Sequence, residues 1–402
     1  MANYRFESNV DEATYRAFLA TQPYSFMQLP EWAHVKKNWG SSALCGVFDG
    51  ETLVAAALLL IHQMPAGFRY IYIGHGPVLD FNNEELVKAF TNGIRAYAKK
   101  IGAFCVRVMP FVVDENYPKQ QMANFGNSFQ QTIDVLKGCG YIHRGLVKEI
   151  HDTIQPRVHM AVPLFNADGP YTHEQLYKHV PGKTRYYLGS FHKDRGIEFK
   201  RVKGETDYST FIGMLDATEE RKGIYLQEKS YYDGITEAFG ERAITYYAIM
   251  HLNKYIDFIK ERIEAGDRVE QNQAKLEEAE RILAERGNEV CLGSSLVIFP
   301  REDAPFKMAE YAYAGSDLSI LAALRVSTGI VFEAACDAID AGCAYLNLGG
   351  VSGTLDDSVA KFKLKFKPQV FEFTGEFDLV VSSFKYHFYE KWYPKIRKLI
   401  RR

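Results

Sequence analysis

Three lysines alternate with apolar residues in the stretch KFKLKF, close to the C-terminal end of the chain. Alternation with a period of two is typical of a β-strand, so Lys361, Lys363 and Lys365 are predicted to share one face of a strand. A row of ammonium groups could hold a polyanion or stabilise an oxyanion. The alternative is a solvated edge strand whose lysines prevent aggregation, and the pattern alone favours this alternative.

A second group of cations lies between residues 178 and 203. This segment has eight Lys or Arg residues against two acidic residues, with aromatic residues interleaved. Cations bind a nucleic-acid backbone and aromatic rings stack on splayed bases, so the segment is a candidate RNA-binding surface. Its candidate contacts are Lys183, Arg185, Lys193 and Arg195. A solvated helix with its aromatic residues in the core explains the composition equally well.

The sequence has none of the common short motifs of nucleotide-binding proteins, zinc proteases or serine hydrolases. GxxxxGK[ST], GxGxxG after a strand, HExxH and GxSxG are all missing, and the 11 histidines lack metal-ligand spacing, so no metal is expected. The order of the expected elements is similar to that of acyl-CoA-dependent N-acetyltransferases. Their Q/R-x-x-G-x-G/A turn, which wraps the pyrophosphate of CoA, is missing too. An acyltransferase of this shape therefore needs a different acyl donor.

The lysine stretch ends a longer segment, residues 310–366, which is predicted to form a strand, a helix and a second strand before KFKLKF. The first strand, EYAYAG, alternates and stops at Gly315. The helix runs from about Thr328 to Ala341, with Ser327 or Thr328 as its N-cap and a glycine after its end. The second strand, residues 344–348, leads into a Gly-Gly turn.

The same order of elements occurs earlier in the chain. Residues 84–101 are an amphipathic helix that Gly102 closes, and the strand AFCVRVMP follows. Two strands precede this helix, TLVAAALLLIHQM and RYIYIGHG, as SSLVIFP and EYAYAGS precede the later one. The sequence therefore predicts a diverged internal duplication: an α/β (α+β) protein of two units with mixed sheets.

Residues 251–286 have a different pattern, in which apolar residues occur at heptad spacing and almost all others are charged. The apolar positions are Leu252, Ile256, Ile259, Ile263, Val269, Leu276 and Leu283. The pattern predicts an antiparallel coiled-coil arm whose two helices bury only each other. Such an arm is typical of an interaction element, not of a catalytic one.

Composition limits the class of protein and its compartment. The 402 residues, of which 47% are hydrophobic, suffice for two or three globular domains. The six scattered cysteines form no CxxC, which favours a reducing compartment. A polar N-terminus and the lack of a long apolar run favour a cytoplasmic protein. The basic, amphipathic stretch 385–402 could lie on anionic lipid, although docking on its own domain is the more common role.

These residues resemble the Fem family of aminoacyltransferases, which build the interpeptide bridge of peptidoglycan from aminoacyl-tRNA. The resemblance covers nearly the whole chain and rests on PEWAHVKKNWG, YIGHGPVLDF, TEERKGIYL, YAYAGSD, YLNLGGVSG and FKLKF followed by FTGEFDLV. It implies two acetyltransferase-like domains, residues 1–155 and 156–374, with an arm at 251–287 inserted in the second. It also implies that residues 375–402 return to the first domain.

The resemblance implies aminoacyl-tRNA as the co-substrate, no cofactor and no metal. The acceptor it implies is a muramyl pentapeptide precursor of peptidoglycan, either lipid-linked or nucleotide-linked. Members with an arm act on the lipid-linked form, which would bring the protein to the inner leaflet of the plasma membrane as a peripheral contact.

The resemblance also implies site residues. Lys36, with Lys37 as its rival, fits a lysine that binds the phosphates of the precursor. Arg221 and Tyr225 match an arginine and a tyrosine that hold the same ligand, and Tyr313 matches a tyrosine of the YAGS motif. Forked hydrogen bonds from Arg, a point charge from Lys and a Tyr hydroxyl together suit a diphosphate.

Lys363 matches a lysine that the family implicates in catalysis. Its ammonium could stabilise the oxyanion that forms when an amine attacks the aminoacyl ester. One departure is Met109, because many relatives have an acidic residue before the following proline. With no obvious carboxylate–His pair, the proton acceptor is not identified from the sequence. The two alternatives are a non-catalytic protein that binds tRNA or the precursor, and an acyl-CoA-dependent N-acyltransferase.

Overall fold

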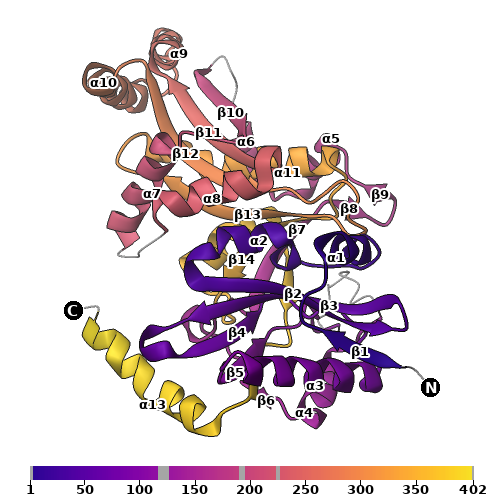
Figure 1. The fold of residues 1–402 in the computed structure, drawn as a ribbon. Helices are drawn as coiled ribbons and strands as arrows, with labels where there is room; N and C mark the ends of the chain where they lie inside the picture. The colour runs from indigo at the N-terminus through magenta and orange to yellow at the C-terminus, as the bar shows by residue number, and fades with distance from the viewer. Residues whose placement is uncertain (1–2, 116–125, 190–194, 223–226, 401–402) are drawn as a thin grey trace.

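The computed structural model describes residues 3–115, 126–189, 195–222 and 227–400 (Figure 1). These residues form two seven-stranded sheets with the same pattern of strand directions. In each sheet the fourth and fifth strands are parallel, and the other neighbouring strands pair antiparallel. The predicted class of two α/β units with mixed sheets is therefore confirmed.

The first sheet is covered on its outer face by α3 (Glu84–Lys100) and α4 (Phe129–Gly138), which pack on it through one apolar cluster. Helix α3 begins and ends where its signals predict: the Asn83 side chain accepts from Leu86 N, and Gly102 has a φ of +73° after its end. In spatial order the strands are β1 (Tyr4–Glu7), β2 (Gly40–Asp49), β3 (Thr52–Gln63), β4 (Arg69–Ile73), β5 (Cys105–Val108), β16 (Phe377–Val380) and β6 (Ile142–His143).

The second sheet has helices on both faces. Residues of α7 (Ser209–Lys222) and α8 (Lys229–Phe239) share an apolar cluster with the first sheet, whereas α11 (Val326–Asp340) packs on the opposite face. The shared cluster also holds residues of α1 (Glu12–Leu19) and α2 (Pro30–Val35), so one continuous core joins the two units. In spatial order the strands are β10 (Ile197–Lys203), β11 (Ala243–His251), β12 (Glu289–Ile298), β13 (Met308–Ser316), β14 (Tyr345–Val351), β7 (Val158–Pro163) and β15 (Gln369–Glu372).

The chain returns to the first sheet through β16, which lies between β5 and β6. A buried carboxylate fixes this strand. Arg107 on β5 donates from Nε and Nη2 to the two oxygens of Asp378, at 2.7 and 2.8 Å, and Arg144 and Tyr386 donate to Asp378 as well. Burial opposes ionisation of Asp378, but the bonds to Arg107 hold its pKa below the ordinary value.

Asp378→Asn is expected to lower the free energy of unfolding by about 3–5 kcal/mol, because the buried guanidinium of Arg107 and the partly buried guanidinium of Arg144 lose their carboxylate. Urea denaturation followed by circular dichroism measures this change. Asp303→Asn is the matched control, since Arg301 and Asp303 form the same two-bond pair at the surface, where it contributes about 1 kcal/mol or less. Because the pKa of Asp378 is lowered, its contribution should be lost as the pH falls through that pKa. Equal losses in both variants would contradict this role of Asp378.

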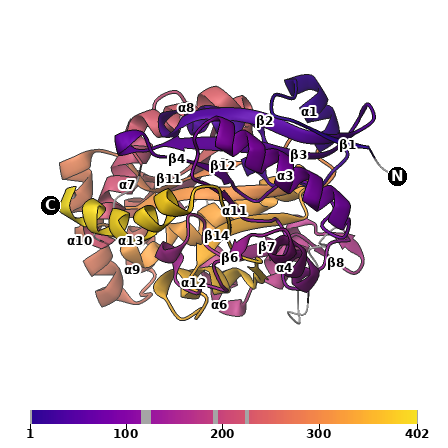
Figure 2. The same cartoon turned by 60° about the horizontal axis from the view of Figure 1, so that its bottom comes forward.

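Helix α13 (Ser383–Ile400) follows β16 and packs on the first unit with its first turns. Tyr386 is buried, and the rings of Phe388 and Phe68 stack at 5.6 Å between centroids. In both views β1 and the end of α13 lie at opposite sides of the molecule (Figure 1, Figure 2). Within the part of the chain that the structure describes, no helix is long and apolar enough to cross a membrane.

The predicted KFKLKF strand is wrong. These residues form the end of α12 (Ser358–Lys363) and the 3-10 helix η8 (Leu364–Phe366). The Asp357 carboxylate starts the helix by accepting from Val359 N and Ala360 N, at 2.6 and 2.9 Å. In a helical segment Lys363 lies on a different face from Lys361 and Lys365, and of the three lysines only Lys363 is buried.

The predicted helical pair is present as α9 (Leu252–Glu264) and α10 (Val269–Arg286), at the far end of the second unit (Figure 1). Its buried residues, however, belong to the core cluster of the second sheet, so the two helices do not bury only each other. The seven-residue spacing was also misleading, because Val269 is 46% exposed whereas Ala279 and Ile282 are buried.

Candidate functional site

A cavity of about 190 Å³ lies between the two sheets, and we call it the inter-sheet cavity. Residues of α2, α8, β13, the bulged part of β14 and the loop after β4 form most of its walls. They are Phe26, Met27, Trp32, Lys36, His75, Gln155, Pro156, His159, Tyr231, Ile298, Glu310, Tyr311, Ala312, Tyr313, Gly349 and Gly350. Two of the predicted precursor-binding residues, Lys36 and Tyr313, are thus in one cavity.

Lys36 directly follows α2 and lies within a cage of aromatic rings. Its Nζ is 4.7–4.8 Å from the ring centroids of Trp32, Trp39 and Tyr231. Burial lowers the pKa of Lys36 to about 8, so the ammonium is charged at neutral pH and loses its proton in mildly alkaline solution. Lys37, the rival candidate, lies on the surface in an ion pair with Glu237.

Tyr231 links the two predicted residues and was missed by the sequence analysis. The hydroxyl of Tyr313 donates to the hydroxyl oxygen of Tyr231 at 2.9 Å, and the ammonium of Lys36 donates to the same oxygen at 3.0 Å. Tyr231 lies in a helix and Tyr313 in a strand about 80 residues apart, so the sequence gives no spacing that connects them. This chain of polar groups suits a phosphate, which accepts from ammonium and hydroxyl donors alike.

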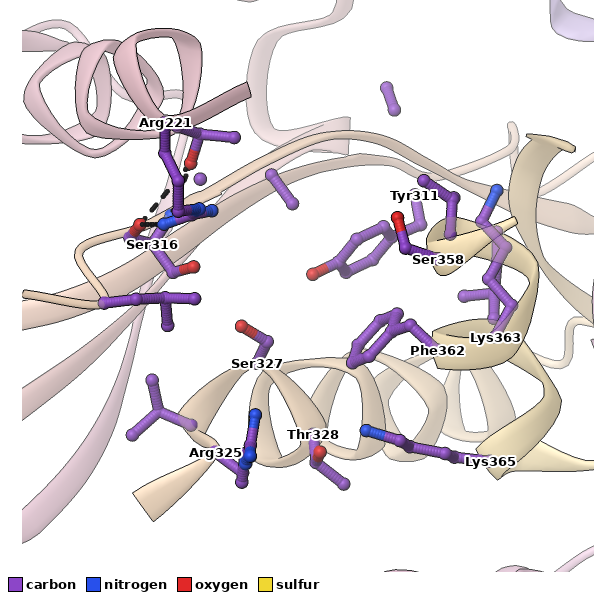
Figure 3. A pocket seen from close by; sticks show the side chains of 18 residues that line it. Arg221, Tyr311, Ser316, Arg325, Ser327, Thr328, Ser358, Phe362, Lys363 and Lys365 are labelled. Atoms are coloured by element: carbon purple, nitrogen blue, oxygen red, sulfur yellow. Dashed lines mark hydrogen bonds between the residues drawn. The ribbon is translucent and has the colours of Figure 1, made fainter. Parts of the chain in front are cut away.

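A second cavity, of about 370 Å³, lies at the start of α11, and we call it the α11 cavity. Figure 3 shows Arg221 at one end of it and Lys363 at the other, with Tyr311, Ser327 and Phe362 between them. Arg221 Nη1 donates to the carbonyl of Ser316 at 3.0 Å. The residues that line the cavity are Thr218, Arg221, Tyr311, Ala312, Ala314, Gly315, Ser316, Leu318, Arg325, Val326, Ser327, Thr328, Leu348, Ser358, Val359, Phe362, Lys363 and Lys365. Tyr225, the predicted partner of Arg221, lies outside the described residues.

The α11 cavity is rich in cationic groups. Arg325 and Lys365 line one side of it, and burial, followed by the charges of Arg325 and Lys183, lowers the pKa of Lys365. The predicted N-caps of α11 are wrong, because the helix begins at Val326 after Arg325, which has a φ of +57°, and no side chain caps it. Ser327 instead lines the cavity, beside the positive end of the helix.

Lys363 lies where the two cavities meet. It is 7% exposed, and its Nζ donates to the carbonyls of Gly349 and Gly350 at 2.9 and 2.8 Å. Lys363 lines the α11 cavity, while both glycines line the inter-sheet cavity. Tyr311 and Ala312 belong to the walls of both cavities. A charge at Lys363 therefore acts on groups bound in either cavity.

A carboxylate–histidine arrangement that the sequence did not reveal is also present. Asn347 Nδ2 donates to Glu310 Oε2 at 2.8 Å and lies 3.2 Å from His159 Nδ1. The only indication in the sequence is that Glu310 is an acidic residue in an otherwise apolar and aromatic strand. Met109, by contrast, is fully buried among apolar residues and has no acid–base role, as its departure from the family pattern indicated.

Two of the four predicted RNA-binding residues line a cleft of about 670 Å³ between α6 (Gly182–Leu188) and the pair α9 and α10, which we call the α6 cleft. Arg185 and Arg195 line it together with three cations of the helical pair, Arg262, Arg268 and Lys275. The remaining lining residues are Tyr177, Gly182, Tyr186, Tyr187, Gly189, Ile197, Tyr255, Phe258, Asp267, Asn272, Glu278, Leu321 and Leu324.

Helix α6 connects this cleft to the α11 cavity. Thr184 Oγ1 donates to the carbonyl of Lys365 at 2.8 Å, and Lys183 is near enough to lower the pKa of Lys365. Arg195 and Arg262 place their guanidinium groups 5.1 and 5.6 Å from the ring centroid of Phe258. The fourth predicted residue, Lys193, lies outside the described residues.

The described part of the chain holds no group of three or more His, Cys, Asp or Glu residues that could bind a metal ion. Two cationic cavities, a buried ammonium between them and a basic cleft are thus the features with which this chain can bind anionic ligands.

Comparison with known proteins shows the family and the fold to which this chain belongs. A protein named Aminoacyltransferase FemA, from Staphylococcus epidermidis, is 25% identical over 422 residues, covering 95% of this chain and 97% of that protein. FemA from Staphylococcus aureus is 24% identical over 408 residues, covering 92% and 94%. A crystal structure of FemX superposes with a TM-score of 0.77 at 20% identity, covering 96% of this chain and 100% of that one, and so shares the fold. The FemAB family model matches residues 10–268 and 260–393, and the chain is therefore a member of the FemAB family.

Proposed function

We propose that this FemAB protein transfers an amino acid from aminoacyl-tRNA, held in the α11 cavity and the α6 cleft, to the stem-peptide amine of a lipid-linked peptidoglycan precursor held in the inter-sheet cavity. The chain is an aminoacyltransferase of peptidoglycan bridge formation that uses aminoacyl-tRNA. The placement of the two substrates and the lipid-linked form of the acceptor are the proposal.

The α6 cleft and the α11 cavity suit the tRNA because they form one basic path. Cations from both the 178–203 segment and the helical pair line the cleft, and α6 carries the path to Arg325 and Lys365. A single strand that ends in an aminoacyl ester needs cations for its phosphates and aromatic rings for its bases. Tyr186, which is 69% exposed in the cleft, is one such ring. The ester would then lie beside Lys363.

The inter-sheet cavity suits the precursor because Lys36, Tyr231 and Tyr313 offer a cation and hydroxyl groups to a diphosphate. A lipid-linked acceptor agrees with the helical pair at 252–286, which the family resemblance associates with that form. It also agrees with the basic C-terminal helix, which could contact the inner leaflet of the membrane from the cytoplasm.

The observation that carries the proposal is the position of Lys363 between the two cavities. An aminoacyl ester is already activated, so transfer needs the two substrates to be held together and the developing oxyanion to be stabilised. Lys363 can serve the oxyanion because it lines the α11 cavity and is held by carbonyls of the inter-sheet cavity.

The reaction is tested by offering the purified protein charged tRNA or acetyl-CoA, each with the lipid-linked or the nucleotide-linked precursor. We expect the stem peptide to gain the mass of one amino-acid residue with charged tRNA, faster on the lipid-linked form. If the mass of the stem peptide increases only with acetyl-CoA, the protein is an acyl-CoA-dependent N-acyltransferase. If the protein binds tRNA or the precursor but the mass of the stem peptide does not increase, it is a non-catalytic tRNA- or precursor-binding protein.

Lys36→Met is expected to raise the KM for the precursor by about 10- to 100-fold, because a charged donor to phosphate is lost. The KM for charged tRNA and the kcat should change little. In the wild type the KM for the precursor should rise above pH 8, where Lys36 loses its charge. Lys37→Met, next in the chain but at the surface, is the control and should match the wild type. An effect of Lys36→Met on charged tRNA alone would move this lysine to the other substrate.

A further inference from the structure

Glu310 lies where the two parallel strands of the second sheet separate. The pairing of β13 with β14 ends at Glu310 and Asn347, after which β13 continues beside β12 and β14 beside β7. The carboxyl group is only 8% exposed, lines the inter-sheet cavity and receives a hydrogen bond from Asn347 on Oε2.

Two buried histidines lie in the same cavity. The rings of His75 and His159 are 5.6 Å apart, and the Nε2 atom of each lacks a hydrogen-bond partner in the described structure. Burial lowers the pKa of His75 to about 3, and burial and then the neighbouring His75 and Lys363 hold the pKa of His159 well below its ordinary value. Both imidazoles are therefore neutral at neutral pH.

Burial has the opposite effect on a carboxylic acid and raises the pKa of Glu310 to about 8. The other titratable groups that line the cavity are His75, His159, Lys36, Tyr231, Tyr311 and Tyr313, and Lys363 is bonded to two of its carbonyls. Tyr24 faces Glu310 from an adjoining cavity. Glu310 is the carboxylic acid among these groups. Burial brings its pKa close enough to neutrality for the group to exchange a proton there.

We propose that Glu310 is the general base of the transfer reaction, an inference that rests on the aminoacyl transfer proposed above. The neutral amine of the acceptor attacks the ester carbonyl, and a nitrogen–carbon bond forms. The carboxylate of Glu310 takes the extra proton from that nitrogen. The ester carbon–oxygen bond then breaks, its electron pair leaves on the ribose oxygen of the tRNA, and Glu310 returns the proton to that oxygen.

Other candidate bases are less suitable. The neutral histidines hold a proton too weakly, given the pKa of His75, to accept one from an amine at neutral pH. Asp378 is bonded to Arg107 and Arg144 in the first sheet, outside the lining of both cavities. Glu310, by contrast, lies in the cavity that would hold the acceptor, and the carbonyls that hold Lys363 line the same cavity.

The test is the single-turnover rate of transfer from aminoacyl-tRNA between about pH 6 and 9 for the wild type, Glu310→Gln and Glu310→Asp. The precursor is kept saturating over this whole range, so that the loss of charge at Lys36 near pH 8 does not enter the rate. In the wild type, ionisation of Glu310 and of the amine, whose ordinary pKa is about 10.4 for a lysine side chain, both raise the rate with pH. The slope of log rate against pH should therefore change from about two to about one near pH 8. Glu302→Gln is the matched control, because Glu302 is exposed and lies six residues before the start of β13. This variant should match the wild type.

Glu310→Gln should react ~10²-fold more slowly or worse at pH 8.5 and show a slope of one without the break. The amide oxygen can still accept from Asn347, so a purely structural role predicts a rate close to wild type. Glu310→Asp keeps a carboxylate and should retain the break at a lower rate, which tests the idea even if the glutamine variant folds poorly. If Glu310→Gln keeps the break or reacts within threefold of the wild type, Glu310 is not the base although the transfer function stands. If the wild type itself transfers nothing from aminoacyl-tRNA, both proposals fall.

Discussion

Lys363→Met is expected to lower the kcat of aminoacyl transfer by ~10²–10³, the usual loss when one donor to an oxyanion is removed. The KM values of both substrates should stay close to wild type, because the proposed phosphate contacts, Lys36 and Arg325 among them, are untouched. The methionine side chain is similar in length to that of lysine, but the carbonyls of Gly349 and Gly350 lose the ammonium that donates to them. We therefore expect a folded variant that is about 1–3 kcal/mol less stable.

Steady-state kinetics with each substrate varied in turn separates these effects. Lys361→Met is the matched control, because Lys361 lies on the same helix, two residues away, and is exposed. Lys363→Arg keeps the charge in a different shape and should recover only part of the rate. If Lys363→Met retains activity within threefold of the wild type, the ammonium beside the ester is supplied by Lys365 instead.

The second large effect concerns the α6 cleft. Replacing Arg195, Arg262 and Arg268 together by Gln is expected to weaken tRNA binding by about 10- to 100-fold near 0.1 M salt. If each arginine neutralises one phosphate, the slope of log affinity against log salt should fall by about 2–3. Arg185 is left in place because its guanidinium also holds the carbonyls of Lys178 and Val180, so its loss would disturb α6.

The control variant loses the same number of positive charges on another surface of the protein, away from the cleft. Lys99, Lys100 and Lys137 are exposed cations on α3 and α4, and their triple Gln variant should bind tRNA almost as the wild type does. Fluorescence anisotropy at two or more salt concentrations measures both variants. Equal losses in the two would mean that tRNA responds to the overall charge and not to the cleft. Residues of the 178–203 segment and of the helical pair line the same cleft, so the proposed tRNA site takes cations from both.

Much of the fold could be predicted because local signals and tertiary structure agree. Helix α3 has an Asn cap, acidic residues in its first turn, basic residues in its last and a glycine after it, and it forms as predicted. The KFKLKF stretch shows the opposite case, because a stretch of only six residues fits the alternating pattern of a strand as well as the pattern of a helix. Its conformation was decided by Asp357, which caps α12, and by the burial of Ala360, Lys363 and Phe366 at helical spacing.

The candidate site was predictable only where a single residue type in a motif indicates it. Lys36 and Tyr313 were predicted from motifs that resemble those of the Fem family, but their link through Tyr231 depends on how α8 packs against α2 and β13. Glu310 was overlooked because its importance comes from the pairing with Asn347 across β13 and β14, which no local pattern records. Burial then changes its acidity, and burial is a property of the folded chain.

The central claim is that the aminoacyl group passes directly from tRNA in one cavity to an amine in the other, beside Lys363. A single-turnover experiment with enzyme in excess over radiolabelled aminoacyl-tRNA, and with saturating lipid-linked precursor, tests it most directly. Each quenched sample gives both the charged tRNA lost and the amino acid gained by the stem peptide. The two amounts should match mole for mole in the wild type, and in Lys363→Met the tRNA should stay charged. Loss of charged tRNA without gain on the stem peptide, or gain that requires acetyl-CoA, would contradict the claim.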